Sequence, residues 1–154
     1  MEYGSIEREI YVDASPEVVF EVVSTAEHLT KWWPDEAVLE PTAGTRGHIV
    51  FHHDAPQEPK IVSIMVVDVE PPRRFSFRWD YGPDAIPGPN DSLLVTFDLE
   101  PSGNGTRVTM RETGFRERGW EAAVLEDIYQ DHSSGWDYFM TRLRTYIARL
   151  VSTS

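Results

Sequence analysis

Apolar and polar residues alternate along much of the first two thirds of the chain, which is the pattern of half-buried β-strands. Ile6, Ile10 and Val12 begin the series, and Arg8 falls on the same face. Further strands are predicted over residues 47–53, 60–70, 75–81, 93–99 and 107–111. The connections between them are short, as at the glycine-rich turn 102–105, so we expect an antiparallel meander.

Helical signals mark the remaining segments. Ser15 followed by Pro16 is typical of a helix N-cap and first helical residue, and it predicts a short helix after the first strand. A second short helix is predicted over residues 26–33, where a proline ends it. Apolar residues at three- and four-residue intervals over 136–150 predict a C-terminal helix of about four turns, preceded by a shorter helical stretch near 120–129.

The order of these elements predicts an α+β fold. A curved antiparallel sheet of about six or seven strands needs one apolar face covered, and the long C-terminal helix is the predicted element large enough to cover it. Two short helices follow the first strand. Because 154 residues are typical of one domain, we expect residues 1–154 to form a single domain.

Composition narrows the classes of partner. The net charge of −12 disfavours nucleic acids and anionic membrane surfaces, because Lys and Arg supply most of the affinity for phosphates. The absence of cysteine excludes disulfides and thiolate metal sites. No signal peptide and no apolar run long enough to cross a bilayer is visible, so we expect a cytoplasmic protein.

Several short motifs occur in an order typical of one superfamily. They are Ala14-Ser15-Pro16, Trp32-Trp33-Pro34, residues 69–75, Gly105-Thr106-Arg107-Val108-Thr109 and Gly135-Trp136. With these motifs the chain resembles the START-like (SRPBCC) superfamily of helix-grip folds, in particular the branch named for homology to activators of the heat-shock-protein-90 ATPase. The resemblance implies a cavity for an apolar or amphipathic small molecule between sheet and C-terminal helix. It does not imply one function, because the superfamily includes lipid carriers, hormone receptors, cyclases and chaperone activators.

Large apolar side chains on the inward face of the predicted strands and C-terminal helix are candidates for lining this cavity. Aromatic rings and methionines offer a large contact area and adaptable packing, which suits a ligand pocket and also a plain core. Both interpretations stay open at this point. The candidate ligand-binding residues of this kind are Trp32, Phe77, Trp79, Tyr81, Phe97, Met110, Trp136, Phe139 and Met140.

Two charged residues also fall on the inward face. The guanidinium of Arg8 is costly there unless it is paired or reaches solvent. Glu112 shares the inward parity of Met110. Arg8 and Glu112 are therefore predicted either to form a structural ion pair or to bind the ligand, with Arg8 holding a ligand carboxylate or phenolate.

The histidines do not form a metal-binding pattern, and no cofactor fingerprint occurs. His48 and His52 share a strand face but lie about 13 Å apart, and His52 and His53 face opposite sides. We therefore expect neither a metal nor a cofactor. His53 has the parity to enter the cavity, where a His53–Glu112 pair would be a candidate general base.

Three functions from different classes remain open. The leading hypothesis is a START-like domain that binds a small hydrophobic or aromatic ligand without catalysis. The second is a protein-interaction module with a chaperone as its partner. The third is a cyclase or hydrolase acting on polyketide-like substrates, which would depend on a pair such as His53 and Glu112. A monomer and a homodimer are both compatible with the sequence.

Overall fold

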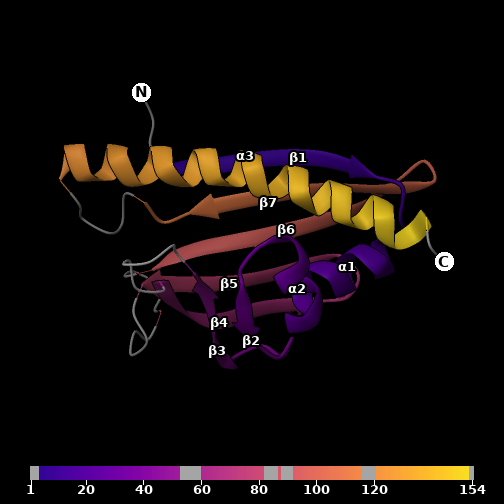
Figure 1. Cartoon of the computed structure of the whole chain (residues 1–154), viewed down its shortest axis with the longest axis horizontal. Coiled ribbons are helices and arrows are strands. Elements are labelled where there is room, and N and C mark those ends of the chain that lie inside the picture. The colour runs from indigo at the N-terminus through magenta and orange to yellow at the C-terminus, as the bar shows by residue number, and fades with distance from the viewer. Residues whose placement is uncertain (1–3, 53–59, 82–86, 88–91, 116–120, 153–154) are drawn as a thin grey trace.

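The computed structural model describes residues 4–52, 60–81, 87, 92–115 and 121–152. Within these residues seven strands form one antiparallel sheet, which is accompanied by two short helices and one long helix (Figure 1). The strands are β1 (Ser5–Val12), β2 (Glu36–Val38), β3 (Arg46–Phe51), β4 (Lys60–Glu70), β5 (Arg74–Tyr81), β6 (Leu93–Ser102) and β7 (Gly105–Thr113). The helices are α1 (Pro16–Ser24), α2 (Ala26–Trp32) and α3 (Ala122–Ser152). The predicted α+β architecture is confirmed.

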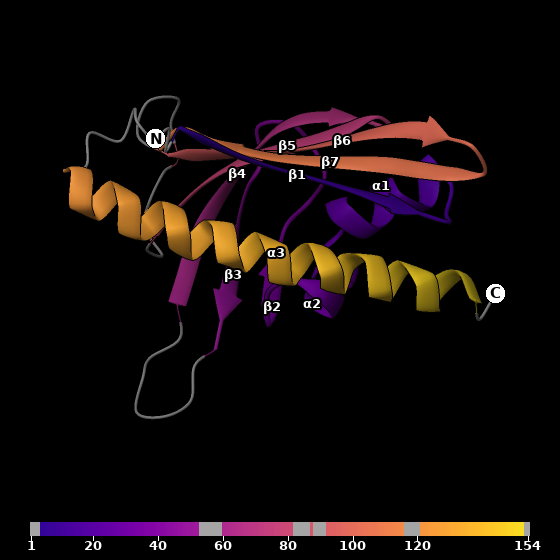
Figure 2. The same ribbon diagram turned by 90° about the horizontal axis from the view of Figure 1, so that it is seen from above.

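The first strand of the chain pairs with the last one. The sheet order is β1-β7-β6-β5-β4-β3-β2, so β2 to β7 form a meander and β1 completes it at the β7 edge. In this register Ile6 lies opposite Glu112, and Arg8 lies opposite Met110. Figure 2 shows α1, α2 and α3 on the same side of the sheet, toward which the sheet curves at β4 and β3. The sheet therefore presents a concave face to α3.

A β-bulge contributes to this curvature. The register between β4 and β5 shifts between Val66 and Asp68. At the bulge the Asp68 backbone N–H donates to Ser76 Oγ at 3.1 Å, and Ser76 Oγ donates to the Asp68 carboxylate at 2.7 Å. Because a bulge bends a strand and increases its twist, it helps to turn β4 toward the helix side of the sheet.

The C-terminal helix is longer than predicted. α3 runs through 31 residues from Ala122 to Ser152, so the two helical segments expected near 120–129 and 136–150 are one helix. Gly135, expected at the start of the long helix, lies inside it. A glycine in a helix interior costs about 1 kcal/mol relative to alanine, and packing on the sheet overcomes this local preference.

The short helices follow the predicted signals closely. The Ser15 hydroxyl accepts a hydrogen bond from the Val18 N–H at 3.3 Å and caps α1, as expected. α2 ends at Trp32, one residue earlier than predicted, and the next N–H, of Trp33, donates to the Leu29 carbonyl at 2.9 Å. β2 was not predicted, because its three residues are too few to show an alternating pattern.

Candidate functional site

A buried carboxylate lies between the sheet and α3. Glu112 on β7 is fully buried, with 0 % exposure. Its oxygens accept hydrogen bonds from the indole N–H of Trp79 on β5 at 2.8 Å and from that of Trp136 on α3 at 2.9 Å. His132 Nδ1, one helical turn before Trp136, lies 3.0 Å from Oε1 and 3.2 Å from Oε2. These contacts compensate the loss of water around the carboxylate.

The Glu112 contacts also orient the His132 ring. An indole N–H can only donate, so both carboxylate oxygens act as acceptors toward Trp79 and Trp136. An ionised Glu112 then requires that His132 Nδ1 carries a hydrogen, which makes Nε2 the basic nitrogen of the neutral ring. A carboxylate that fixes the tautomer and orientation of a histidine is the arrangement that general bases use.

A pocket of about 200 Å³ lies beside this cluster. Trp33, Phe51, Lys60, Trp79, Asp131, His132, Gly135, Trp136 and Phe139 line it. Lys60 and Asp131 are exposed and form the charged rim, whereas Trp33, Trp79, His132 and Trp136 are buried. The ring centroid of Trp33 lies 5.3 Å from that of Trp136, 5.4 Å from that of Trp79 and 6.0 Å from that of Phe51. The pocket is therefore mainly aromatic, with the polar His132 in its wall.

The pocket has the size of a small aromatic molecule. A cavity of about 150 Å³ in a protein core is enough to hold benzene. The 200 Å³ here would accommodate one ring with a small substituent, or a fused pair of rings that fills it completely.

The predicted cavity residues divide into a pocket group and a core group. Trp79, Trp136 and Phe139 line the pocket. The buried residues that do not line it are Trp32, Phe77, Phe97, Met110 and Met140. His53 and the side chain of Tyr81 lie outside the described residues, so the expected His53–Glu112 pair has no structural description.

The two adjacent tryptophans separate between these groups. The Trp32 indole N–H donates to the Val22 carbonyl at 3.3 Å, and the Trp32 ring packs edge-on against Phe97. Trp33 instead lies in the pocket wall. Trp33 thus has the place in the pocket wall that was predicted for Trp32. The reason is that α2 ends between the two residues and the Trp33 backbone leaves the helical conformation.

Arg8 forms a structural ion pair, but its partner is Asp137 on α3 and not Glu112. Arg8 Nε donates to the Asp137 carboxylate at 2.6 Å, and its NH2 group donates to Ser133 Oγ at 2.7 Å, both on α3. The Arg8 side chain is long enough to carry the guanidinium past the core to the edge of α3. It is therefore 28 % exposed. The indole and imidazole donors from inside the molecule surround Glu112 in its place.

Several pocket residues were not predicted. They are Trp33, Phe51, Lys60, Asp131, His132 and Gly135. His132 lies four residues before Trp136 and seven before Phe139, so extending the apolar stripe of the C-terminal helix by one turn would have found it. Lys60 and Asp131 carry no such signal, because charged side chains are usually solvated and have no apolar periodicity.

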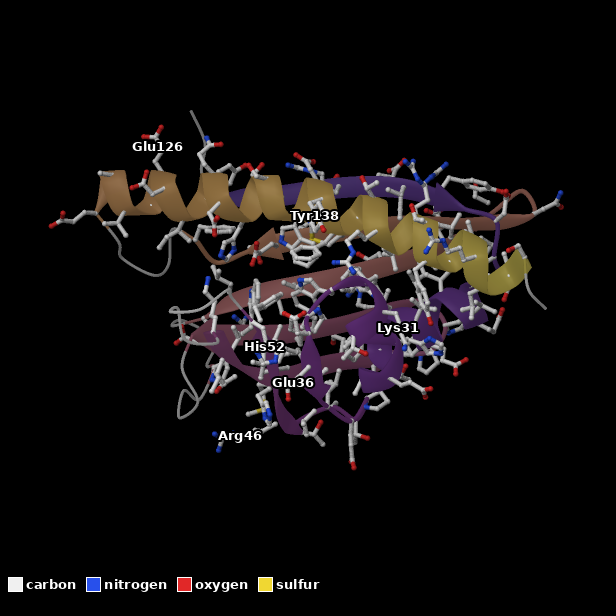
Figure 3. All side chains as sticks on the ribbon, in the orientation of Figure 1. Lys31, Glu36, Arg46, His52, Glu126 and Tyr138 are labelled. Carbon is white, nitrogen blue, oxygen red and sulfur yellow. The ribbon has the colours of Figure 1, made fainter. Side chains whose placement is uncertain are left out.

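No group of three or more potential metal ligands occurs among the residues that the structure describes. His52 pairs with Glu36 on the exposed side of β2 and β3, where Figure 3 shows the two side chains next to each other. His28 Nδ1 contacts the Tyr146 hydroxyl at 2.7 Å. These two histidines are therefore engaged away from the aromatic pocket.

Residues 13–148 match the model of the family described as Activator of Hsp90 ATPase homolog 1-like protein. The chain belongs to this family. No curated protein matches the chain. Membership confirms the resemblance inferred from the sequence motifs and from the helix-grip order of elements.

Solved structures share the fold of this family member. Protein MLL2253 from Mesorhizobium loti is 22 % identical, with a TM-score of 0.74 over 94 % of this chain and 97 % of that one. Protein BH1534 from Bacillus halodurans is 30 % identical, with a TM-score of 0.66 over 93 % and 96 % of the two chains. The Aha1 dimer from Colwellia psychrerythraea is 20 % identical, with a TM-score of 0.68 over 93 % and 95 % of the two chains.

In the described parts of our chain, no helix is long and apolar enough to span a membrane.

Proposed function

We propose that this family member binds a small aromatic molecule in the pocket between α3 and the β3–β5 part of the sheet. The observation that carries the proposal is the wall of the pocket, where the rings of Trp33, Phe51, Trp79, Trp136 and Phe139 meet. Aromatic surface that a core does not fill gains free energy when a planar apolar ligand covers it. Offset or edge-to-face ring contacts add about 0.5–1.5 kcal/mol per pair beyond burial.

A polar substituent on the ligand is supported by the same pocket. His132 is the buried polar side chain in its wall, and Glu112 holds the ring of His132 in one orientation. A few placed polar groups in a mainly apolar pocket fix the orientation of a ligand. Lys60 lies at the rim of the pocket. Because its ammonium group has three N–H donors, it can contact an anionic group of the ligand while it keeps a partner in the protein. We therefore propose a ring bearing a hydroxyl or carboxylate group.

Calorimetric titration of the purified protein with phenol, 2-naphthol and cyclohexanol tests the proposal. Phenol and 2-naphthol are expected to bind at one site with dissociation constants between about 10 μM and 1 mM, the range for ligands with few atoms. Cyclohexanol, which has the hydroxyl but no aromatic ring, is expected to bind about 2- to 13-fold more weakly than phenol. Absence of saturable binding by both aromatic compounds would overturn the proposal.

Binding to a chaperone is a second candidate function, and the description of the family favours it. The expected result is that the purified chain accelerates ATP hydrolysis by Hsp90 in a concentration-dependent way. An unchanged ATPase rate at saturating concentrations of the chain would exclude this candidate. The same assay in the presence of 2-naphthol would show whether a filled pocket affects the interaction.

The relative from Colwellia psychrerythraea supports a homodimer as the assembly of this chain, because its solved structure is that of a dimer. Closed two-fold dimers are the commonest homo-oligomers. Size-exclusion chromatography with light scattering distinguishes the homodimer from a monomer, whose mass is 17.6 kDa.

A further inference from the structure

We infer that Gly135 determines the size of the ligand that the pocket accepts. Glycine has no side chain, and the space that a side chain would fill at this position is part of the pocket. The inference rests on the proposed function, since it concerns which aromatic molecules fit the same pocket. It assigns to one residue of α3 the choice between single-ring and fused two-ring ligands.

The position of Gly135 on α3 is the first observation. His132, Gly135, Trp136 and Phe139 are separated by three or four residues, so they share one face of the helix. All of them line the pocket. On this face, the side chains of His132, Trp136 and Phe139 project toward the sheet, and at Gly135 the row has a gap. The pocket includes that gap.

The space around Gly135 is the second observation. A Cβ atom added there would meet nothing within 4 Å. At Gly47 an added Cβ would meet the Val38 carbonyl oxygen at 2.2 Å, and at Gly105 it would meet the Val12 carbonyl oxygen at 2.1 Å. Close packing of the backbone therefore requires a glycine at Gly47 and Gly105, but it does not require one at Gly135.

The backbone conformation does not require a glycine at this position either. The described glycines with positive φ are Gly44, Gly103 and Gly114, whereas Gly135 lies within the regular helix α3. A glycine inside a helix is less favourable than alanine, because it loses more conformational entropy on folding. Neither the backbone conformation nor close packing requires a glycine at position 135. What Gly135 adds to the pocket is the open space in front of its backbone.

The consequence is a ligand whose ring approaches the backbone of α3 between His132 and Phe139. The pocket volume of about 200 Å³ exceeds the roughly 150 Å³ that suffices for benzene, so the wild-type chain has room for a second fused ring. A methyl group at position 135 would remove space close to the volume of one water molecule, ~30 Å³. This loss leaves enough room for phenol but not for 2-naphthol.

Calorimetric titration of Gly135→Ala, Gly135→Leu and a control variant with phenol and 2-naphthol tests the inference. The control is Ser134→Leu, which places the same side chain on the adjacent, exposed position of the helix. Overpacking should weaken the binding of 2-naphthol to Gly135→Ala by about 5- to 150-fold, while the affinity for phenol changes by less than about threefold. Gly135→Leu should lose both ligands, and Ser134→Leu should bind both like the wild type.

The outcomes separate this inference from the proposed function. Wild-type affinity of Gly135→Ala for 2-naphthol, with wild-type selectivity over phenol, would overturn the role of Gly135 and leave the pocket proposal intact. Failure of the wild-type chain to bind either compound would overturn the pocket proposal itself. Gly135→Ala decides the question even where Gly135→Leu does not fold, because alanine favours the helix.

Discussion

Glutamine at position 112 tests the hydrogen-bonded cluster that forms one wall of the pocket. Glu112→Gln keeps the shape of the side chain but replaces one acceptor oxygen by an NH₂ group, which can only donate. All of the partners described for the Glu112 carboxylate are N–H donors, from Trp79, Trp136 and His132. The amide group therefore opposes at least one of these donors in either orientation.

The size of the effect follows from burial. Hydrogen bonds to charged groups contribute about 1.5–3 kcal/mol, and a buried donor without an acceptor costs about 1–3 kcal/mol. Because Glu112 has 0 % exposure, water cannot replace the lost acceptor in the folded state. We expect Glu112→Gln to lower the free energy of unfolding by about 2–4 kcal/mol, out of the roughly 5–15 kcal/mol that stabilises a typical domain.

Urea unfolding followed by far-ultraviolet circular dichroism measures this loss, with Glu9→Gln as the matched control. The Glu9 side chain is 61 % exposed, so its substitution should change the free energy of unfolding by less than about 0.5 kcal/mol. The melting temperature of Glu112→Gln should fall by about 4–16 °C, given ~2–4 °C per kcal/mol for a chain of this size. An unfolding free energy of Glu112→Gln within about 0.5 kcal/mol of wild type would show that the buried N–H donors do not depend on the carboxylate for stability.

Three further predictions concern residues outside the Glu112 cluster. Arg8→Met should reduce the unfolding free energy by less than about 1 kcal/mol in urea titrations, because its partner Asp137 is 66 % exposed; a loss above about 3 kcal/mol would contradict the partly exposed geometry. Ser15→Ala should cost about 0.5–2 kcal/mol in the same assay through the lost cap of α1, and an unchanged midpoint would contradict it. Burial, and then the charges of two nearby glutamates, raise the pKa of Tyr146, so its phenolate absorbance should emerge at higher pH than that of a free tyrosine. The folded state favours the neutral phenol. The unfolding free energy of wild type relative to that of Tyr146→Phe should therefore be constant below about pH 10 and fall as the pH rises further. If this difference in unfolding free energy stayed constant above that pH as well, the raised pKa would be contradicted.

Periodicity predicted the fold because a sheet with one buried face repeats every two residues and an amphipathic helix every three or four. The strand face that carries Phe77 and Trp79 and the stripe that carries Trp136 and Met140 are buried where the pattern placed them. Residues 130–135 separate the two helical segments in the sequence pattern, because they are polar or, at Gly135, have no side chain. Asp131, His132 and Gly135 in this stretch line the pocket, so part of the site lies where the apolar pattern has no signal.

The site itself was less accessible to sequence reasoning, because it depends on which inward residues meet across elements. Parity placed Arg8 and Glu112 on one face, but the register sets Arg8 opposite Met110, and its long side chain reaches Asp137. His132 was missed because a lone histidine in a helix is common and its partner Glu112 is 20 residues away in the chain. Pairing across such distances follows from the tertiary structure alone.

Heteronuclear NMR of the ¹⁵N-labelled chain, titrated with 2-naphthol, shows whether an aromatic molecule binds in this pocket. Binding in the pocket should produce saturable shifts of the backbone amide of Gly135 and of the indole N–H groups of Trp79 and Trp136. The amides of Gly103, in the turn after β6, and of Gly105, at the start of β7, should not move, because those residues are not among the ones that line the pocket. Shifts confined to other parts of the chain, or no saturable shift at Gly135, Trp79 and Trp136, would mean that the aromatic molecule does not bind in this pocket.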